Sequence, residues 1–112
     1  MEKESRILQS IKKFSAGNKK IEKELVETIM LHLVQELKEI GKCLNNNDWF
    51  GLKKIAHKLT STFVFLEISR AIELTETIKN TAGIYPKNTK KETSELIEIC
   101  NGLISELKKS KD

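Results

Sequence analysis

The sequence predicts an all-α protein, an antiparallel up-down four-helix bundle with a short extra helix at its N-terminal end. Three observations carry this prediction. Proline occurs once and glycine five times in 112 residues, so long stretches contain no helix breaker. Those stretches are rich in leucine, isoleucine, glutamate and lysine, with apolar residues three or four positions apart. No segment alternates polar and apolar residues over enough positions to predict a strand.

The first two helices are predicted over residues 4–14 and 19–44. Apolar residues share one side of the first helix, and a Ser-Ala-Gly-Asn break follows it. Asn18 can accept a hydrogen bond from the first turn of the second helix and so cap it. The inward positions are Ile7, Leu8 and Ile11, then Ile21, Leu25, Ile29, Leu33, Leu37, Ile40 and Leu44.

The third and fourth helices are predicted to end near residues 66 and 81. A polar Asn-Asn-Asn-Asp run separates the third helix from the second, and Asn47 or Asp48 can cap it. Ser69 offers a cap for the fourth helix. The inward positions of the fourth helix are Ile72, Leu74 and Ile78.

A loop over residues 83–88 is expected to separate the fourth helix from the last. Gly83 fits the position directly after a helix, where a left-handed conformation is common. Thr89 and Glu92 match a capping box, in which side chains and backbone exchange two hydrogen bonds. The last helix is therefore predicted from Thr89 to about Lys109. Its inward positions are Leu96, Ile99, Cys100, Leu103, Ile104 and Leu107.

The length fits one domain over residues 1–112, with the bundle core over about 19–109.

The net charge is +4, but 18 of the 20 basic residues are lysine, which lacks the planar fork with which arginine reads bases. The lysines interleave with glutamates, as on a solvated helix face. Only six residues are aromatic, which leaves little for stacking on bases. No nucleic-acid partner is therefore expected.

Targeting and redox signals are also weak. No apolar run approaches the ~18 residues of a membrane span, and residues 1–5 are too charged for a signal peptide. Cys43 and Cys100 form no CxxC pair, so both are expected as small core residues rather than zinc ligands or a disulfide. We expect a cytoplasmic protein with no membrane partner, no metal site and no cofactor of its own. Met1 favours a free-standing chain.

The third helix carries the candidate chemistry. Helical spacing of about 100° per residue, counted from Leu52, places the core stripe within about 60°. His57 falls near 140°, outside that stripe. No aspartate or glutamate occurs from Trp49 to Leu66. The core stripe comprises Leu52, Ile55, Ala56, Leu59, Phe63 and Leu66. The neighbours on the side of His57 are Lys53, Thr60, Ser61 and Val64, with Lys54 a little further round and Lys58 on another side.

A histidine in this setting suits the transfer of a phosphoryl group. A solvent-exposed imidazole is largely uncharged at neutral pH and is therefore nucleophilic. This segment offers no carboxylate that would orient His57 as a general base. Lys53 and Lys54 can offset the charge of a phosphoryl group, and the small Ser61 lets another protein approach the ring. An accessible nucleophile in positive surroundings, without an activated water, is typical of a covalent phosphate carrier.

The segment Asp-Trp-Phe-Gly-Leu-Lys-Lys-Ile-Ala-His-Lys-Leu-Thr-Ser-Thr-Phe at residues 48–63 resembles the histidine phosphotransfer (HPt) domain of two-component phosphorelays. That family has an acidic residue and often an aromatic residue at the helix start, then leucine, then Ala-His-x-Leu-Lys-Gly/Ser. The order of the other predicted helices is similar too. The resemblance therefore covers the whole chain as a single HPt-like domain.

The resemblance implies that His57 is the phosphoacceptor. It implies a monomeric phosphoryl carrier without turnover chemistry of its own. Its partners would be response-regulator receiver domains and a hybrid sensor histidine kinase, with magnesium on the receiver. The phosphoryl group would come from a receiver phosphoaspartate and pass to another receiver.

Two positions depart from the family pattern. Thr60 stands where the family usually has lysine, and Glu67 stands near a position where many members have glycine. A lysine elsewhere on the third helix can compensate for Thr60. The candidate residues for binding phosphate or a partner are Lys53, Lys54, Lys58, Thr60, Ser61 and Val64.

Two other functions are compatible with the sequence. Thr60 favours an adaptor with the same bundle that transfers nothing, and the basic charge allows a small helical nucleic-acid-binding protein. His32 lacks the neighbours of His57 and is expected to be partly buried or simply on the surface. Phe50 and Phe65 either contact a partner or pack against the first helix or the loop, and packing is preferred. Trp49 is expected to pack at one end of the bundle.

Overall fold

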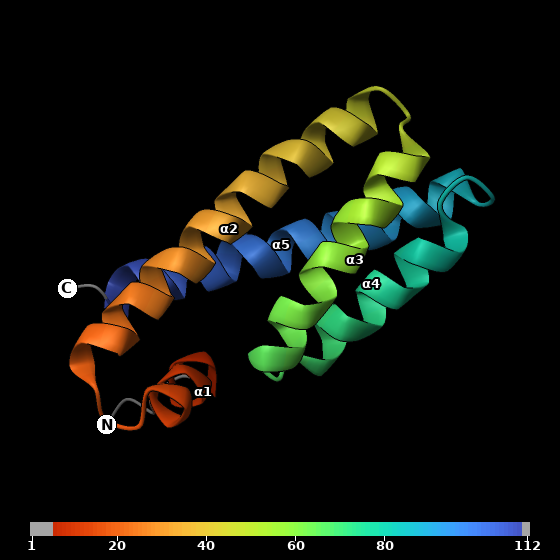
Figure 1. Cartoon of the computed structure of the whole chain (residues 1–112). Coiled ribbons are helices and arrows are strands. Elements are labelled where there is room, and N and C mark those ends of the chain that lie inside the picture. The colour runs from red at the N-terminus through yellow and green to blue at the C-terminus, as the bar shows by residue number, and fades with distance from the viewer. Residues whose placement is uncertain (1–5, 111–112) are drawn as a thin grey trace.

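The computed structural model describes residues 6–110 and is all-helical over that part of the chain. Helices α2 to α5 lie alongside one another, and α1 crosses one end of this group (Figure 1). Helix α2 packs on α3 and α5, and α4 packs on the same two helices. No helix within residues 6–110 is long and apolar enough to cross a membrane. The helices are α1 (Arg6–Ser15), α2 (Lys19–Asn45), α3 (Trp49–Phe65), α4 (Ser69–Thr81) and α5 (Pro86–Ser110).

The all-α prediction is confirmed, and three predicted helix ends have the expected chemistry. The Asn18 side chain accepts a hydrogen bond from the backbone N–H of Ile21 at 3.1 Å. Asp48 Oδ1 accepts one from the N–H of Gly51 at 2.9 Å, so Asp48 is the cap of α3. Gly83 follows the end of α4 with a φ of +86°, in the left-handed region that favours glycine. The first predicted residues of α1, before Arg6, lie outside the described residues.

The predicted cap of α4 is wrong. Ser69 is the first residue of the helix itself, and the capping position is occupied by Ile68, which makes no side-chain hydrogen bond there.

The predicted capping box of α5 is also wrong, because the helix begins at Pro86. Proline suits a first helical position, since its fixed φ is already helical and its missing N–H is not needed there. The Thr89 hydroxyl lies 2.8 Å from Thr81 Oγ1 and 2.9 Å from the Tyr85 carbonyl oxygen. The Thr81 hydroxyl in turn donates to Glu92 Oε1 at 2.8 Å. The two predicted capping residues therefore tie α5 to the end of α4.

The hydrophobic core runs through the middle of the helical group, with Phe63 fully buried. The inward face of α2 differs from the predicted stripe at its start. Ile21 is 41% exposed, because the buried face of α2 passes through Val26 and ends at Cys43. The prediction that Ile21 lies inward is therefore wrong. The buried residues of α2 are Val26, Ile29, Leu33, Glu36, Ile40 and Cys43.

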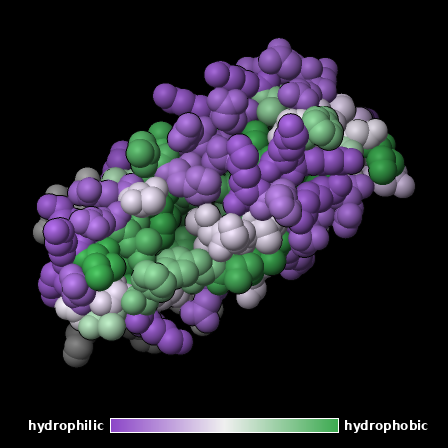
Figure 2. Space-filling view, viewed as in Figure 1, coloured by the Kyte–Doolittle hydropathy of each residue, from purple (hydrophilic) through white to green (hydrophobic). Residues whose placement is uncertain are grey.

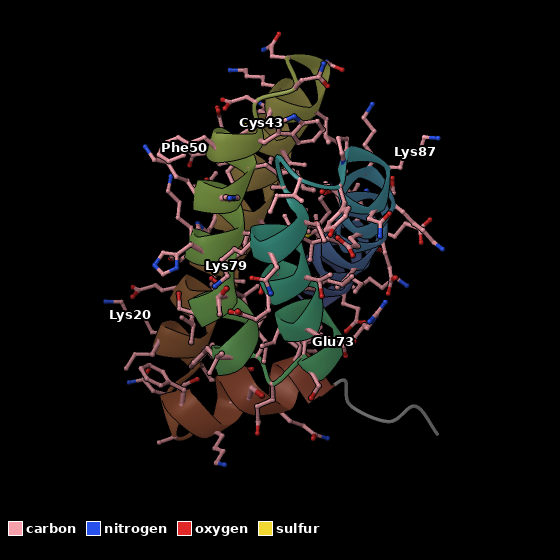
Figure 3. All side chains as sticks on the ribbon, turned by 90° about the vertical axis from the view of Figure 1, so that its right-hand side faces the viewer. Lys20, Cys43, Phe50, Glu73, Lys79 and Lys87 are labelled. Atoms are coloured by element: carbon pink, nitrogen blue, oxygen red, sulfur yellow. The ribbon has the colours of Figure 1, made fainter. Side chains whose placement is uncertain are left out.

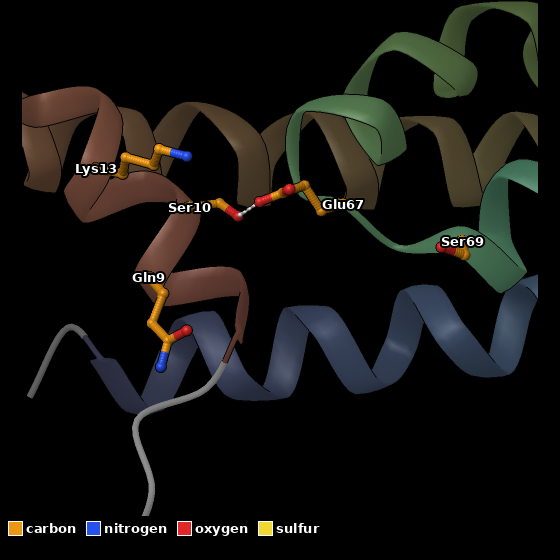
Figure 4. A pocket seen from close by; sticks show the side chains of 5 residues that line it. All are labelled: Gln9, Ser10, Lys13, Glu67 and Ser69. Atoms are coloured by element: carbon orange, nitrogen blue, oxygen red, sulfur yellow. Dashed lines mark hydrogen bonds between the residues drawn. The ribbon is translucent and has the colours of Figure 1, made fainter.

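Helix α1 is fixed to the turn between α3 and α4. The Ser10 hydroxyl donates to Glu67 Oε2 at 3.1 Å, as the dashed line in Figure 4 marks. Glu67 has a φ of +58°, so the backbone at this turn takes the left-handed conformation that glycine adopts most easily. The Phe14 ring meets the Phe65 ring edge-on, with centroids 5.4 Å apart. Phe65 thus packs against α1, as predicted.

Glu36 is a carboxylate within this core. It is 6% exposed, and its Oε2 has no hydrogen-bond partner among the described residues. Burying such a group without a partner costs about 1–3 kcal/mol. Replacing Glu36 by methionine, which is similar in shape and apolar, is expected to raise the free energy of unfolding by about that amount in urea titrations.

The control for this prediction is Glu39→Met, because Glu39 lies on the same helix with an exposed side chain. That variant is expected to stay within about 0.5 kcal/mol of the parent. A Glu36→Met protein less stable than the parent would mean that the Glu36 carboxylate has a stabilising partner.

Candidate functional site

The start of α3 is held close to the end of α2. A Cβ atom on Gly51 would lie 2.5 Å from Asp48 Oδ2 and 2.8 Å from Cys43 Sγ, so a larger residue here would force the capping Asp48 side chain or the Cys43 side chain to shift. The neighbouring Trp49 is half-buried against the core. The buried residues on the inner face of α3 are Leu52, Ile55, Ala56, Leu59 and Phe63.

His57 lies on the opposite face of α3 and is exposed, as the helical spacing predicts. It lines a shallow recess of about 510 Å³, which we call the histidine recess. Lys54 Nζ lies 4.8 Å from the centre of the Phe50 ring, so the ring stacks beneath a cation. Phe50 is 69% exposed, and the preference for packing at this residue is therefore wrong (Figure 3). The residues of the histidine recess are Phe50, Lys53, Lys54, His57 and Lys58.

The charges around His57 favour the binding of an anion. Three of the five residues of the histidine recess are lysines, and its two other residues are His57 and the uncharged Phe50. Within residues 6–110, no hydrogen bond or ion pair joins the His57 ring to a carboxylate. The ring nitrogens are thus open to an approaching electrophile, and lysine side chains can offset the charge of a phosphoryl group.

Thr60 lies apart from the histidine recess. It is half-buried between α3 and α4, with its hydroxyl 2.9 Å from the Ala56 carbonyl oxygen and 3.1 Å from Thr75 Oγ1. The Thr75 hydroxyl itself donates to the carbonyl oxygen of Ile72 at 2.7 Å. The structure therefore uses Thr60 to join two helices.

Ser61 and Val64 continue the exposed face of α3 beyond His57. Val64 is 55% exposed, and the exposed Ser61 borders a second depression of about 290 Å³, which we call the apolar groove. Figure 2 shows hydrophobic side chains gathered on this side of the molecule, while most of the remaining visible surface is hydrophilic. The residues of the apolar groove are Phe14, Leu25, Ile29, Ser61, Thr62 and Phe65.

Sequence reasoning missed three of these residues as part of a surface near His57. Phe14, Leu25 and Ile29 come from α1 and α2, and only the folded arrangement brings them beside the end of α3. The spacing within a single helix contains no signal for that arrangement.

The other reactive side chains of the described chain are less accessible. His32 is half-buried, and Cys43 and Cys100 are buried and free. Burial raises the pKa of the Cys100 thiol to about 12. Burial, followed by the charges of Asp48 and Glu39, raises the pKa of the Cys43 thiol. Both thiols therefore stay protonated at neutral pH and serve as core residues.

Among residues 6–110, no three histidine, cysteine or acidic side chains gather as metal ligands would. Comparison with protein-family models, with curated proteins and with solved structures finds no match to this chain. The histidine recess is therefore the candidate functional site of the described residues.

Proposed function

We propose that this protein is a phosphorelay intermediate, which accepts a phosphoryl group on His57 from a receiver-domain phosphoaspartate and passes it to another receiver. The observation that supports this most is an exposed imidazole on a firmly packed helix, in a recess that three lysines line. The likeness of residues 48–63 to HPt domains points the same way. Helices α2 to α5 would then form the antiparallel up-down bundle of that family, with α1 as the extra helix.

The transfer needs only one nucleophile from this chain. A lone pair on an imidazole nitrogen of His57 attacks phosphorus, and a new N–P bond forms. The P–O bond of the acyl phosphate breaks, and its electron pair stays on the aspartate carboxylate. The proton on the other ring nitrogen passes to solvent. Transfer to the next receiver reverses these steps, so the protein is a carrier rather than a turnover enzyme.

Most of the charge stabilisation would come from the receiver, which would supply magnesium, because phosphoryl transfer depends mainly on positioning and electrostatics. This chain would contribute a fixed imidazole, lysines around it and a surface for docking. The receiver would sit over the histidine recess and extend past Ser61 toward the apolar groove. We propose a monomeric cytoplasmic protein served by a hybrid sensor histidine kinase.

A second candidate is an adaptor that binds receivers without accepting phosphate. The observation that favours it is Thr60, whose hydroxyl is engaged between α3 and α4 where a phosphate-facing lysine would be expected. The two candidates differ in one measurable product, phosphohistidine.

The test is to incubate the full chain with phosphorylated receivers from the same cell and search for phosphate on His57. Acid-labile phosphate located on His57 by mass spectrometry is the expected result. Stable binding to a receiver without any phosphohistidine would favour the adaptor. Retention on DNA that falls steeply with salt, with no phosphohistidine, would instead favour a nucleic-acid-binding protein.

A further inference from the structure

The register of α3 against α4 is fixed by side-chain contact. The two helices are antiparallel (Figure 1), and the Thr60 and Thr75 hydroxyl oxygens lie 3.1 Å apart. Both helices rise by about 1.5 Å per residue. A residue a given number of positions after Thr75 therefore lies level with the residue the same number of positions before Thr60. Lys79, four residues after Thr75, lies level with Ala56, four residues before Thr60. It is thus opposite the turn of α3 that carries His57.

Lys79 lies at the solvent side of the contact between α3 and α4. Its side chain is 25% exposed, and Figure 3 shows it where the two helices adjoin. Lys79 Nζ pairs with Glu76 Oε1 at 2.7 Å, and the Glu76 side chain is 55% exposed. The Lys79 side chain is therefore largely covered at the helix contact, while the Glu76 side chain that pairs with it is more than half exposed.

We propose that Lys79 binds the phosphoryl group carried by His57, and so supplies from α4 the positive charge that Thr60 does not supply from α3. This inference rests on the proposed function. It differs from a role for the three lysines of the histidine recess, because those lysines lie on α3 itself, where Lys54 and Lys58 are exposed and Lys53 is half-buried. The charge of a half-buried lysine side chain is screened less by solvent and salt than that of an exposed one.

The ion pair between Lys79 and Glu76 would break when the phosphoryl group is attached to His57. A phosphoryl dianion carries more charge than a carboxylate, and it offers three acceptor oxygens to the ammonium. Lys79 would then exchange an exposed carboxylate for the phosphoryl group. Removing the Glu76 charge should make Lys79 more available.

The inference can be tested without a partner protein, with phosphoramidate as the phosphoryl donor. The His57 nitrogen attacks phosphorus, the P–N bond of phosphoramidate breaks, and ammonia leaves with the electron pair and takes up the proton that the ring releases. Phosphorus NMR then follows both the rate of phosphorylation and the titration of the attached phosphoryl group. The proteins to compare are the parent chain, Lys79→Met, Lys79→Gln, Glu76→Gln and Lys87→Met.

We expect Lys79→Met and Lys79→Gln to be phosphorylated roughly threefold to tenfold more slowly than the parent. We also expect the phosphoryl dianion to take up a proton and become the monoanion about half a pH unit higher in these variants, because a nearby ammonium favours the dianion. Glu76→Gln should leave that titration unchanged or move it lower. Lys87→Met is the matched control, since Lys87 is exposed at the start of α5, away from Lys79 (Figure 3).

The outcomes separate this inference from the proposed function. A parent chain that acquires no phosphate on His57 would overturn both. Normal phosphorylation of the parent, with Lys79→Met and Lys79→Gln behaving like Lys87→Met, would overturn the role of Lys79 alone. Thermal melts by circular dichroism identify any variant that fails to fold. If one of the two Lys79 variants fails to fold, the phosphorylation rate and titration of the other variant decide whether Lys79 has this role.

Discussion

Replacing His57 by glutamine is expected to abolish phosphorylation by a receiver while leaving the fold intact. Glutamine is polar and similar in reach, but its amide cannot form a stable bond to phosphorus. The His57 ring is exposed and makes no hydrogen bond within the described residues, so its loss should change the free energy of unfolding by less than about 0.5 kcal/mol. The measurement is incorporation of labelled phosphate from a phosphorylated receiver, together with a urea titration.

The matched control is His32→Gln, which removes the other histidine of the chain. His32 is half-buried on α2 and has no part in the histidine recess, so this variant should accept phosphate at the parent rate. The assignment is wrong if His57→Gln still accepts phosphate and His32→Gln does not.

Replacing Ser61 by arginine is expected to slow transfer strongly. Ser61 is exposed one turn beyond His57, and it borders the apolar groove. Residues four apart share a helix face, so a long side chain here would stand between the receiver and the His57 ring. We expect the transfer rate to fall roughly tenfold, equivalent to about 1.4 kcal/mol of docking free energy. Thermal stability should stay within about 0.5 kcal/mol, as for most surface changes.

Charge is a second effect of arginine, since a guanidinium could attract the phosphoryl group. Ser61→Gln adds bulk without charge and should also slow transfer. The two variants are compared with the same receiver and with phosphoramidate, which is small enough to avoid the obstruction. Unimpaired transfer from the receiver in both variants would exclude docking over this face.

Local signals in the sequence predicted the starts of α2 and α3 correctly. Asn18 and Asp48 each bond to an N–H three residues away, so neighbouring residues settle those helix ends. The capping box failed because Thr89 and Glu92 bond to Thr81, which belongs to the preceding helix. Such a contact depends on how α4 and α5 pack, and the sequence pattern does not contain that information.

In the candidate site, too, features that depend on one helix could be predicted from the sequence, and features that depend on helix packing could not. The outward direction of His57 depends on α3 alone, and the spacing from Leu52 predicted it. The engagement of Thr60 with Thr75 depends on the register between α3 and α4. The position of Phe14 depends on how α1 crosses the end of the other helices.

The pattern of helix contacts also bears on how the chain folds. Four of its main interfaces join helices that follow each other in the chain: α1–α2, α2–α3, α3–α4 and α4–α5. Only α2–α5, among the substantial interfaces of residues 6–110, joins distant segments. Contacts between neighbouring segments require little loop-closure entropy, and helical proteins of this kind fold in microseconds to milliseconds. The α3–α4 hairpin has a turn of only three residues, so the helix that bears His57 can become ordered before α2 and α5 pack together.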